Sequence, residues 1–131
     1  MWMTVDTKKV WQVLIIEDDD RLRTTLKKLL EQEGFMVQDA EEGNSGLALF
    51  KKTPADLVIT DLIMPGKEGM ETIIDIRKTN KDVKIIAISG GGRVRAAEYL
   101  PVAEIAGADM TLAKPFSFNQ LLGKVNKLLD G

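Results

Sequence analysis

Five short apolar runs, rich in β-branched residues, are the feature that most constrains how this 131-residue chain folds. The clearest run is Leu57 to Thr60, and Val10 to Ile16 and Val83 to Ile88 share its character. Predominantly apolar runs of this length are typical of parallel strands that helices cover on both faces. Two weaker runs, Phe35 to Ala40 and Met110 to Ala113, complete a set of five predicted strands.

Apolar residues at helical spacing fill the intervals between the predicted strands. The first set is Leu22, Leu26, Leu29 and Leu30, followed by Gly34, which is expected to end the helix. The second set is Leu47, Ala48 and Phe50, and the third is Met70, Ile73 and Ile74, which are all expected to face the sheet. The last helix has Leu121, Leu122, Val125, Leu128 and Leu129. The remaining helix is predicted from about Glu98 to Ala106, because Pro101 fits only in a first turn. Ser117 and Gln120 have capping-box spacing before the last helix. The alternation predicts an α/β fold with one doubly wound parallel sheet.

The length of the chain predicts one domain, with residues 10–131 folded and residues 1–9 forming a flexible leader. The net charge is -2, and no basic stripe indicates direct binding to nucleic acid. No apolar run approaches the length of a membrane span, and there is no cysteine. We therefore expect a cytoplasmic protein that binds neither membranes nor nucleic acid. The chain also has no histidine, which excludes Ser-His-Asp hydrolysis and most zinc enzymes.

Four of the predicted strands end in polar groups: Glu17 and Asp18, Asp61, Ser89, and Lys114. In a parallel sheet these ends share one edge, where ligands bind. Carboxylates without histidine or cysteine form an all-oxygen site, which favours Mg²⁺, with Mn²⁺ as the alternative. A carboxylate beside such a metal can attack phosphorus, while a lysine and a hydroxyl bind the phosphoryl oxygens. Asp61, Lys114 and Ser89 fit these three roles.

These residues, in this order, resemble the receiver domain of two-component response regulators. The motifs are Glu17-Asp18, Asp61-Leu62-Ile63-Met64-Pro65 followed by Gly69, Ser89-Gly90, and Lys114-Pro115-Phe116. The resemblance covers about Val10 to Leu129, and an ordered set of motifs is far more specific than any one motif. It implies a flavodoxin-like sheet of strand order 2-1-3-4-5 with five helices.

The resemblance also implies a role for each site residue. Asp61 would accept a phosphoryl group from a histidine kinase or a histidine phosphotransfer protein. Ser89 would move to contact that group, and Lys114 would pair with it, next to a cis peptide at Pro115. The groups expected to hold Mg²⁺ are Glu17, Asp18, Asp61 and the backbone carbonyl of Ile63.

The expected output is a change in docking surface rather than turnover of a substrate. Phosphorylation would shift an equilibrium between two forms of the surface around helix four, strand five and helix five. Since the chain stops after the fifth helix, we expect a stand-alone receiver. Its partner would be a downstream effector protein, the next histidine phosphotransfer domain in a relay, or a second copy of the chain. As a signalling protein it would catalyse only its own phosphorylation and slow dephosphorylation.

Two features depart from the pattern of the family. Thr111 occupies the position of the family's usual aromatic switch residue. This chain therefore has no ring there whose inward turn could be coupled to movement of Ser89. The interval from Ser89 to Lys114 is slightly longer than is common, and the extra residues fall near Gly90 to Arg95. Our hypothesis for this loop is that Arg93 and Arg95 reach toward a phosphorylated Asp61.

Two other classes of function share part of this pattern. Haloacid-dehalogenase-type phosphatases also form an aspartyl phosphate, but they need a second acid two residues after the nucleophile, where this chain has Ile63. The second class is a phosphorylation-independent binding module with the receiver fold. Such modules usually lack an acid, the nucleophile or the lysine, and this chain keeps them all. The module remains the alternative interpretation.

Overall fold

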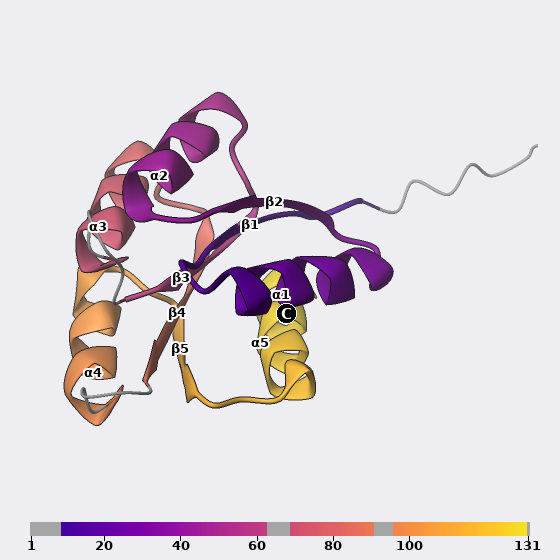
Figure 1. Ribbon diagram of the computed structural model, residues 1–131. Coiled ribbons are helices and arrows are strands. Elements are labelled where there is room, and N and C mark those ends of the chain that lie inside the picture. The colour runs from indigo at the N-terminus through magenta and orange to yellow at the C-terminus, as the bar shows by residue number, and fades with distance from the viewer. Residues whose placement is uncertain (1–8, 63–68, 91–95, 131) are drawn as a thin grey trace, which may run out of the picture.

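The computed structural model describes residues 9–62, 69–90 and 96–130, and in them five parallel strands alternate with five helices (Figure 1). The elements are β1 (Gln12–Ile16), α1 (Asp20–Gln32), β2 (Met36–Ala40), α2 (Gly43–Lys52), β3 (Leu57–Asp61), α3 (Gly69–Thr79), β4 (Lys84–Gly90), α4 (Ala96–Ala106), β5 (Met110–Lys114) and α5 (Phe118–Asp130). The strand order is β2-β1-β3-β4-β5. Both the α/β fold and the flavodoxin-like strand order are confirmed.

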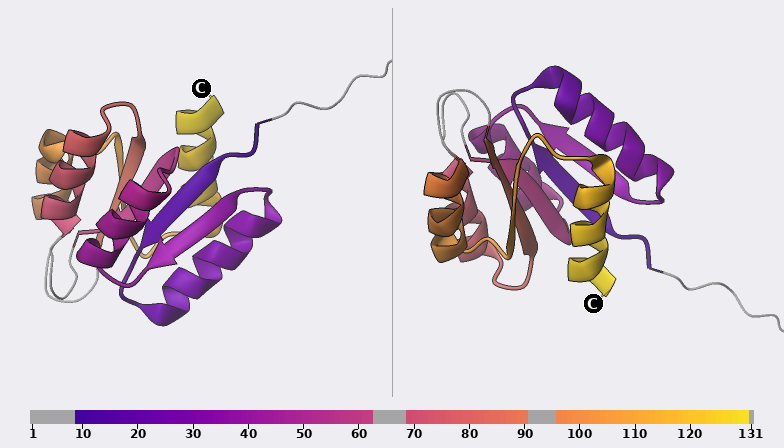
Figure 2. Two further views of the ribbon diagram at one scale, coloured as in Figure 1. Left: turned by 90° about the horizontal axis from the view of Figure 1, so that it is seen from above. Right: turned by 90° about the horizontal axis from the view of Figure 1, so that it is seen from below.

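The sheet lies between two layers of helices, with α1 and α5 on one face and α2, α3 and α4 on the other (Figures 1 and 2). Alternate residues of β1 serve the two layers: Val13 and Ile15 pack with the α1 and α5 side chains, whereas Leu14 and Ile16 pack with those of α2 and α3. All five residues of β3 are buried. A strand that is covered on both faces needs apolar residues without alternation, which explains the pattern of the sequence.

The predicted helix boundaries rest on local signals that the structure contains. Gly34 follows α1 with φ of 98°, a conformation that glycine adopts readily. Before α5, the Gln120 backbone amide donates to Ser117 Oγ over 3.1 Å, and the Ser117 amide donates to Gln120 Oε1 over 2.8 Å. This reciprocal pair is the predicted capping box. At the start of α1, the side chain of Asp19 accepts a hydrogen bond from the Leu22 amide.

The prediction for Pro101 is wrong. α4 begins at Ala96, so Pro101 lies inside the helix rather than in its first turn. A proline there removes one backbone hydrogen bond. Pro101 itself is exposed, while Ala103 is fully buried in the core on the α2, α3 and α4 side. Packing of the helix against the sheet therefore outweighs the missing bond.

Smaller differences concern the ends of strands and one helical face. β1 begins at Gln12, two residues later than predicted, and Val10 is half exposed. β4 continues to Gly90, so Ser89 lies within the strand. Ile74 was expected to face the sheet, but 39% of its surface is exposed, because the buried face of α3 is formed by Ile73 and Ile76.

The two ends of the described chain lie together at the amino edge of the sheet. Lys9 and Val10 line a hollow of about 380 Å³ together with Asn126 and Asp130 of α5.

Residues 1–8 of the expected leader lie outside the described residues. In the described part of the chain, no helix has both the length and the apolar character needed to cross a membrane.

Glycines in two helices give a matched pair of substitutions. A Cβ at Gly69, the first residue of α3, would lie 2.6 Å from Leu62 Cα and even closer to the Asp61 carbonyl oxygen. A Cβ at Gly123, inside α5, would meet no atom within 4 Å. We expect Gly69→Ala to lower the free energy of unfolding by about 1–3 kcal/mol through overpacking. Gly123→Ala should raise it by about 0.5–1 kcal/mol through helix propensity.

Urea unfolding followed by circular dichroism checks both glycine variants. Equal stability of the two proteins would contradict the close approach of α3 to the Asp61 backbone.

Candidate functional site

The structure gathers the predicted site residues at the carboxyl edge of the sheet. Glu17 and Asp18 directly follow β1, Asp61 ends β3, and Lys114 ends β5. Ser89 is the second-last residue of β4 and lies opposite Ala113 in the register with β5. Parallel pairing thus brings residues that are up to 97 positions apart onto one edge. Ile63 lies outside the described residues, and so do Gly91, Arg93 and Arg95.

The ammonium group of Lys114 bridges two buried carboxylates. Its Nζ donates a hydrogen bond to Asp61 Oδ2 over 2.8 Å and lies 2.9 Å from Glu17 Oε1. Glu17 is 1% exposed and Asp61 is 6% exposed. Burial lowers the pKa of Lys114, but the contacts with Asp61 and Glu17 outweigh it and leave this pKa raised. The lysine is therefore charged and shared between the two acids.

The charge of Glu17 is poorly compensated even with Lys114 beside it. Burial raises the pKa of Glu17 to about 7, and the nearby Asp61 carboxylate acts in the same direction, against Lys114. Glu17 Oε2 accepts a hydrogen bond from the Asp19 amide. Glu17 Oε1 lies in the ion pair with Lys114, but no donor among the described residues meets the geometry of a hydrogen bond to it. More positive charge at this position would stabilise the ionised form.

Glu17, Asp18 and Asp61 have the geometry and chemistry to hold a divalent cation. One carboxylate oxygen of each lies within 4.8 Å of those of the other two. Asp18 is exposed, so the cluster is open to solvent on one side. All three donors are oxygens, which suits Mg²⁺ or Mn²⁺, and a bound cation would supply the charge that Glu17 lacks. The residues present therefore fit such a metal.

Ser89 and Thr111 occupy neighbouring strands beside this cluster. Ser89 is fully buried, and its hydroxyl oxygen has no hydrogen-bond partner among the described residues. A buried hydroxyl without a partner is unusual in folded proteins and is a candidate for a functional role. Thr111 is half-buried in β5, opposite Ala87. The peptide bond between Lys114 and Pro115 is cis, as the resemblance implies.

One residue of this region escaped the sequence analysis. Arg23 in α1 is 8% exposed, and its Nη1 donates to the backbone carbonyl of Glu17 over 2.9 Å. The sequence carries a signal for it, because Arg23 shares the helical spacing of the buried Leu26 and Leu30. A charged residue on the apolar face of a helix is rarely buried without partners.

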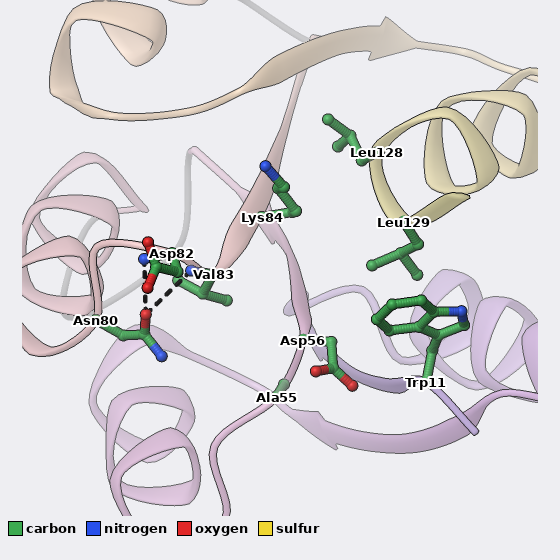
Figure 3. A pocket seen from close by; sticks show the side chains of 9 residues that line it. All are labelled: Trp11, Ala55, Asp56, Asn80, Asp82, Val83, Lys84, Leu128 and Leu129. Carbon is green, nitrogen blue, oxygen red and sulfur yellow. Dashed lines mark hydrogen bonds between the residues drawn. The ribbon is translucent and has the colours of Figure 1, made fainter. Parts of the chain in front are cut away.

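A second hollow, of about 220 Å³, lies at the opposite edge of the sheet near Trp11 (Figure 3). Two of its polar side chains accept hydrogen bonds from backbone amides near the start of strands. Asp56 Oδ2 accepts from the Gln12 amide. Asn80 Oδ1 accepts from the amides of Asp82 and Val83, as the dashed lines in Figure 3 show. These contacts support the structure of the strand ends, and the candidate functional residues lie at the carboxyl edge instead.

Known proteins match almost the whole length of this chain. The family model described as "Response regulator receiver domain" matches residues 13–126. The chain is 33% identical over 118 residues to the transcriptional regulatory protein CpxR of Klebsiella pneumoniae, covering 90% of this chain and 49% of the relative. It is 32% identical over 120 residues to the sensor kinase CckA of Brucella abortus, covering 90% of this chain and 12% of the relative. The chain thus spans about half of one curated relative and a small part of the other.

Solved structures agree with this result. The response regulator TrrA of Thermotoga maritima, solved in complex with Mg(2+)-BeF, has 36% identity and a TM-score of 0.81, with 92% of this chain and 100% of that chain covered. A Francisella response regulator receiver domain has 28% identity and a TM-score of 0.81, with coverage of 90% and 95%. On the matched motifs, the family model and the fold, the chain belongs to the response regulator receiver family.

Proposed function

We propose that this receiver is a phosphoacceptor switch of a two-component or phosphorelay system, with Asp61 as the acceptor. The observation that carries the proposal is the Lys114 ammonium, which lies 2.8 Å from Asp61 beside the acidic cluster. A buried carboxylate at the end of a parallel strand, next to a fixed cation, can act as a nucleophile toward phosphorus. The phosphate donor would be a histidine kinase or a histidine phosphotransfer protein, which implies a cytoplasmic location.

In the proposed reaction, a carboxylate oxygen of Asp61 attacks the phosphorus of a phosphohistidine. The new P–O bond forms as the P–N bond breaks, and the histidine nitrogen leaves with the electron pair and takes up a proton. Lys114 would move its hydrogen bond from Asp61 to a phosphoryl oxygen, and the Ser89 hydroxyl would donate to another. Both contacts grow stronger as charge develops on the phosphoryl group.

The metal ligands in the proposal are Glu17, Asp18, Asp61 and the backbone carbonyl of Ile63. Mg²⁺ held there would offset the charge of the phosphoryl oxygens. Burial of Glu17 and Asp61 keeps the local dielectric low, which strengthens each electrostatic contact.

A largely apolar hollow of about 350 Å³ beside Lys114 supports docking of the donor protein. It is lined by Asp19, Leu22, Lys114, Pro115 and Phe116. An apolar surface next to the acceptor gives a donor domain a place to bury side chains while its phosphohistidine approaches.

For the output we propose that the surface of α4, β5 and α5 binds a second copy of the chain. A separate effector protein is the alternative partner for this surface. Ile105 is 85% exposed and Val102 is 47% exposed, both on α4. Large apolar side chains exposed next to each other on one helix are typical of surfaces that bind another protein.

The first prediction concerns phosphorylation itself. Incubation with acetyl phosphate and Mg²⁺ should add one phosphoryl group to the native chain and none to Asp61→Asn, because the amide is not a nucleophile. Intact-mass spectrometry measures the gain, and omission of Mg²⁺ should abolish it. A folded native protein that gains no mass from acetyl phosphate or from a phosphohistidine donor would favour the phosphorylation-independent binding module.

The second prediction concerns the metal-free acidic cluster. The folded-state pKa of Glu17, about 7, lies above the ordinary value of 4.5, so the unfolded chain releases this proton first as the pH rises. The contribution of Glu17 to stability therefore falls between about pH 4.5 and pH 7 and stays low above that range. Glu17→Gln in EDTA should raise the free energy of unfolding by about 1–3 kcal/mol at pH 8 and by less at pH 5.

Urea unfolding at the two pH values measures this effect, and exposed Glu31→Gln in α1 is the matched control. Mg²⁺ should stabilise the native chain and the control but not Glu17→Gln. Equal stabilisation of all three proteins by Mg²⁺ would remove Glu17 from the ligand set.

The third prediction concerns the output surface. Treatment with acetyl phosphate should convert the native protein from monomer to dimer in sedimentation equilibrium, and Ile105→Glu should remain a monomer while still gaining the phosphoryl group. Met36→Glu is the control, because Met36 is 57% exposed on the edge strand β2, away from α4. A native protein that stays monomeric after full phosphorylation would rule out the homodimer and leave the effector protein as the occupant.

A further inference from the structure

We propose that Arg23 is a positioning residue for the divalent cation, because it fixes the peptide that joins Glu17 to Asp18. This inference rests on the metal site of the proposed function. Arg23 lies in the second turn of α1 and touches none of the reacting groups, but it is almost fully buried beside the acidic turn.

The guanidinium of Arg23 ties together three parts of the chain. Its Nη1 donates to the Glu17 carbonyl over 2.9 Å, at the end of β1. Its Nε donates to Asp39 Oδ2 over 2.9 Å, in β2. Its Nη2 donates to Asp20 Oδ1 over 2.7 Å, at the start of α1. These contacts link β1, β2 and α1 at the point where the chain turns from strand to helix.

The contact with the Glu17 carbonyl bears directly on the metal ligands. That carbonyl belongs to the peptide unit between Glu17 and Asp18, so its direction fixes the backbone from which both side chains extend. The amide of Glu17 is held as well, by a hydrogen bond of 3.0 Å to the carbonyl of Ala40, the last residue of β2. With both of its main-chain groups bound, Glu17 presents its carboxylate in a set direction, and Asp18 follows from a fixed peptide plane.

The charge of Arg23 is balanced within its own network. Burial lowers its pKa, but Asp20 and Asp39 outweigh that effect and keep the pKa raised, so the guanidinium is always charged. Asp39 is also 3.3 Å from Lys27, and Glu41 lies 3.8 Å from Arg23. Because the two hydrogen-bonded carboxylates offset the positive charge, Arg23 can hold the turn that carries Glu17 and Asp18 without strongly repelling a cation. A lysine has no planar fork to reach all three acceptors at once.

A purely structural role for Arg23 makes a different prediction. If the network only attached α1 to β2, its loss would lower the stability of the fold, but the folded fraction would bind metal with unchanged affinity. If Arg23 orients the ligands, the affinity of the folded protein itself falls. Changes to groups that orient metal ligands typically weaken binding about 10–100-fold.

Arg77 provides a matched control at the other edge of the sheet. It donates to the carbonyls of Lys81, Val83 and Gly107 and to Asp109, and so joins α3 to the loops before β4 and β5. Its contacts are of the same kind as those of Arg23, and none of its partners belongs to the acidic cluster. Arg77→Lys should therefore lower stability without changing metal affinity.

The experiment titrates each folded protein with Mn²⁺ and counts the free ion by electron paramagnetic resonance, with no phosphate donor present. We expect Arg23→Lys to weaken Mn²⁺ binding at least about tenfold relative to the native chain and Arg77→Lys. Asp39→Asn, which loosens the guanidinium but leaves the Glu17 carbonyl in place, should weaken binding less. Circular dichroism confirms that each variant is folded at the temperature used.

The outcomes separate this inference from the function on which it rests. A native chain that binds no Mn²⁺ would overturn the metal site itself. A native chain that binds Mn²⁺, with the same affinity in Arg23→Lys, would overturn the positioning role alone. If Arg23→Lys does not fold, Asp39→Asn decides the question, and unchanged affinity in that variant overturns the proposal.

Discussion

Burial of the central strand β3 on both faces is the constraint on which the rest of this structure depends. Leu57 to Asp61 are all buried, so the backbone polar groups of β3 must pair with β1 and β4. Polar side chains are excluded from the middle of such a strand and collect where it ends. The register then places Asp61 beside Glu17 and within reach of Lys114.

Packing and charge act together at this edge. The same burial that excludes water from the carboxylates raises the pKa of Glu17 and makes Lys114 necessary as a partner. The fold alone therefore does not fully compensate the negative charge of the buried carboxylates. A divalent cation or a phosphoryl group bound at this edge would change the balance of charge sharply, which supports the switch proposed above.

Much of this arrangement could be predicted from the sequence, because β3 and the helices carry strong periodic patterns. The strand ends Glu17, Asp61 and Lys114 follow directly from those patterns, and parallel topology alone brings them together. Pro101 could not be placed correctly, because packing of α4 on the sheet offsets a hydrogen bond that local rules count as lost. Arg23 was missed for a similar reason: the acceptors that make its burial favourable are a carbonyl and an aspartate from other elements.

The position of the chain ends has a consequence for how such a unit is used. Lys9 and Asp130 line one hollow at the amino edge, while the acidic cluster lies at the carboxyl edge. Sequence joined at either end would emerge on the side away from Asp61 and would leave the approach of the proposed phosphate donor unobstructed. The geometry is thus modular, and similar domains account for about half of CpxR and for a small part of CckA. One folded unit can be combined with very different neighbours because its chain ends and its acidic cluster lie at opposite edges of the sheet.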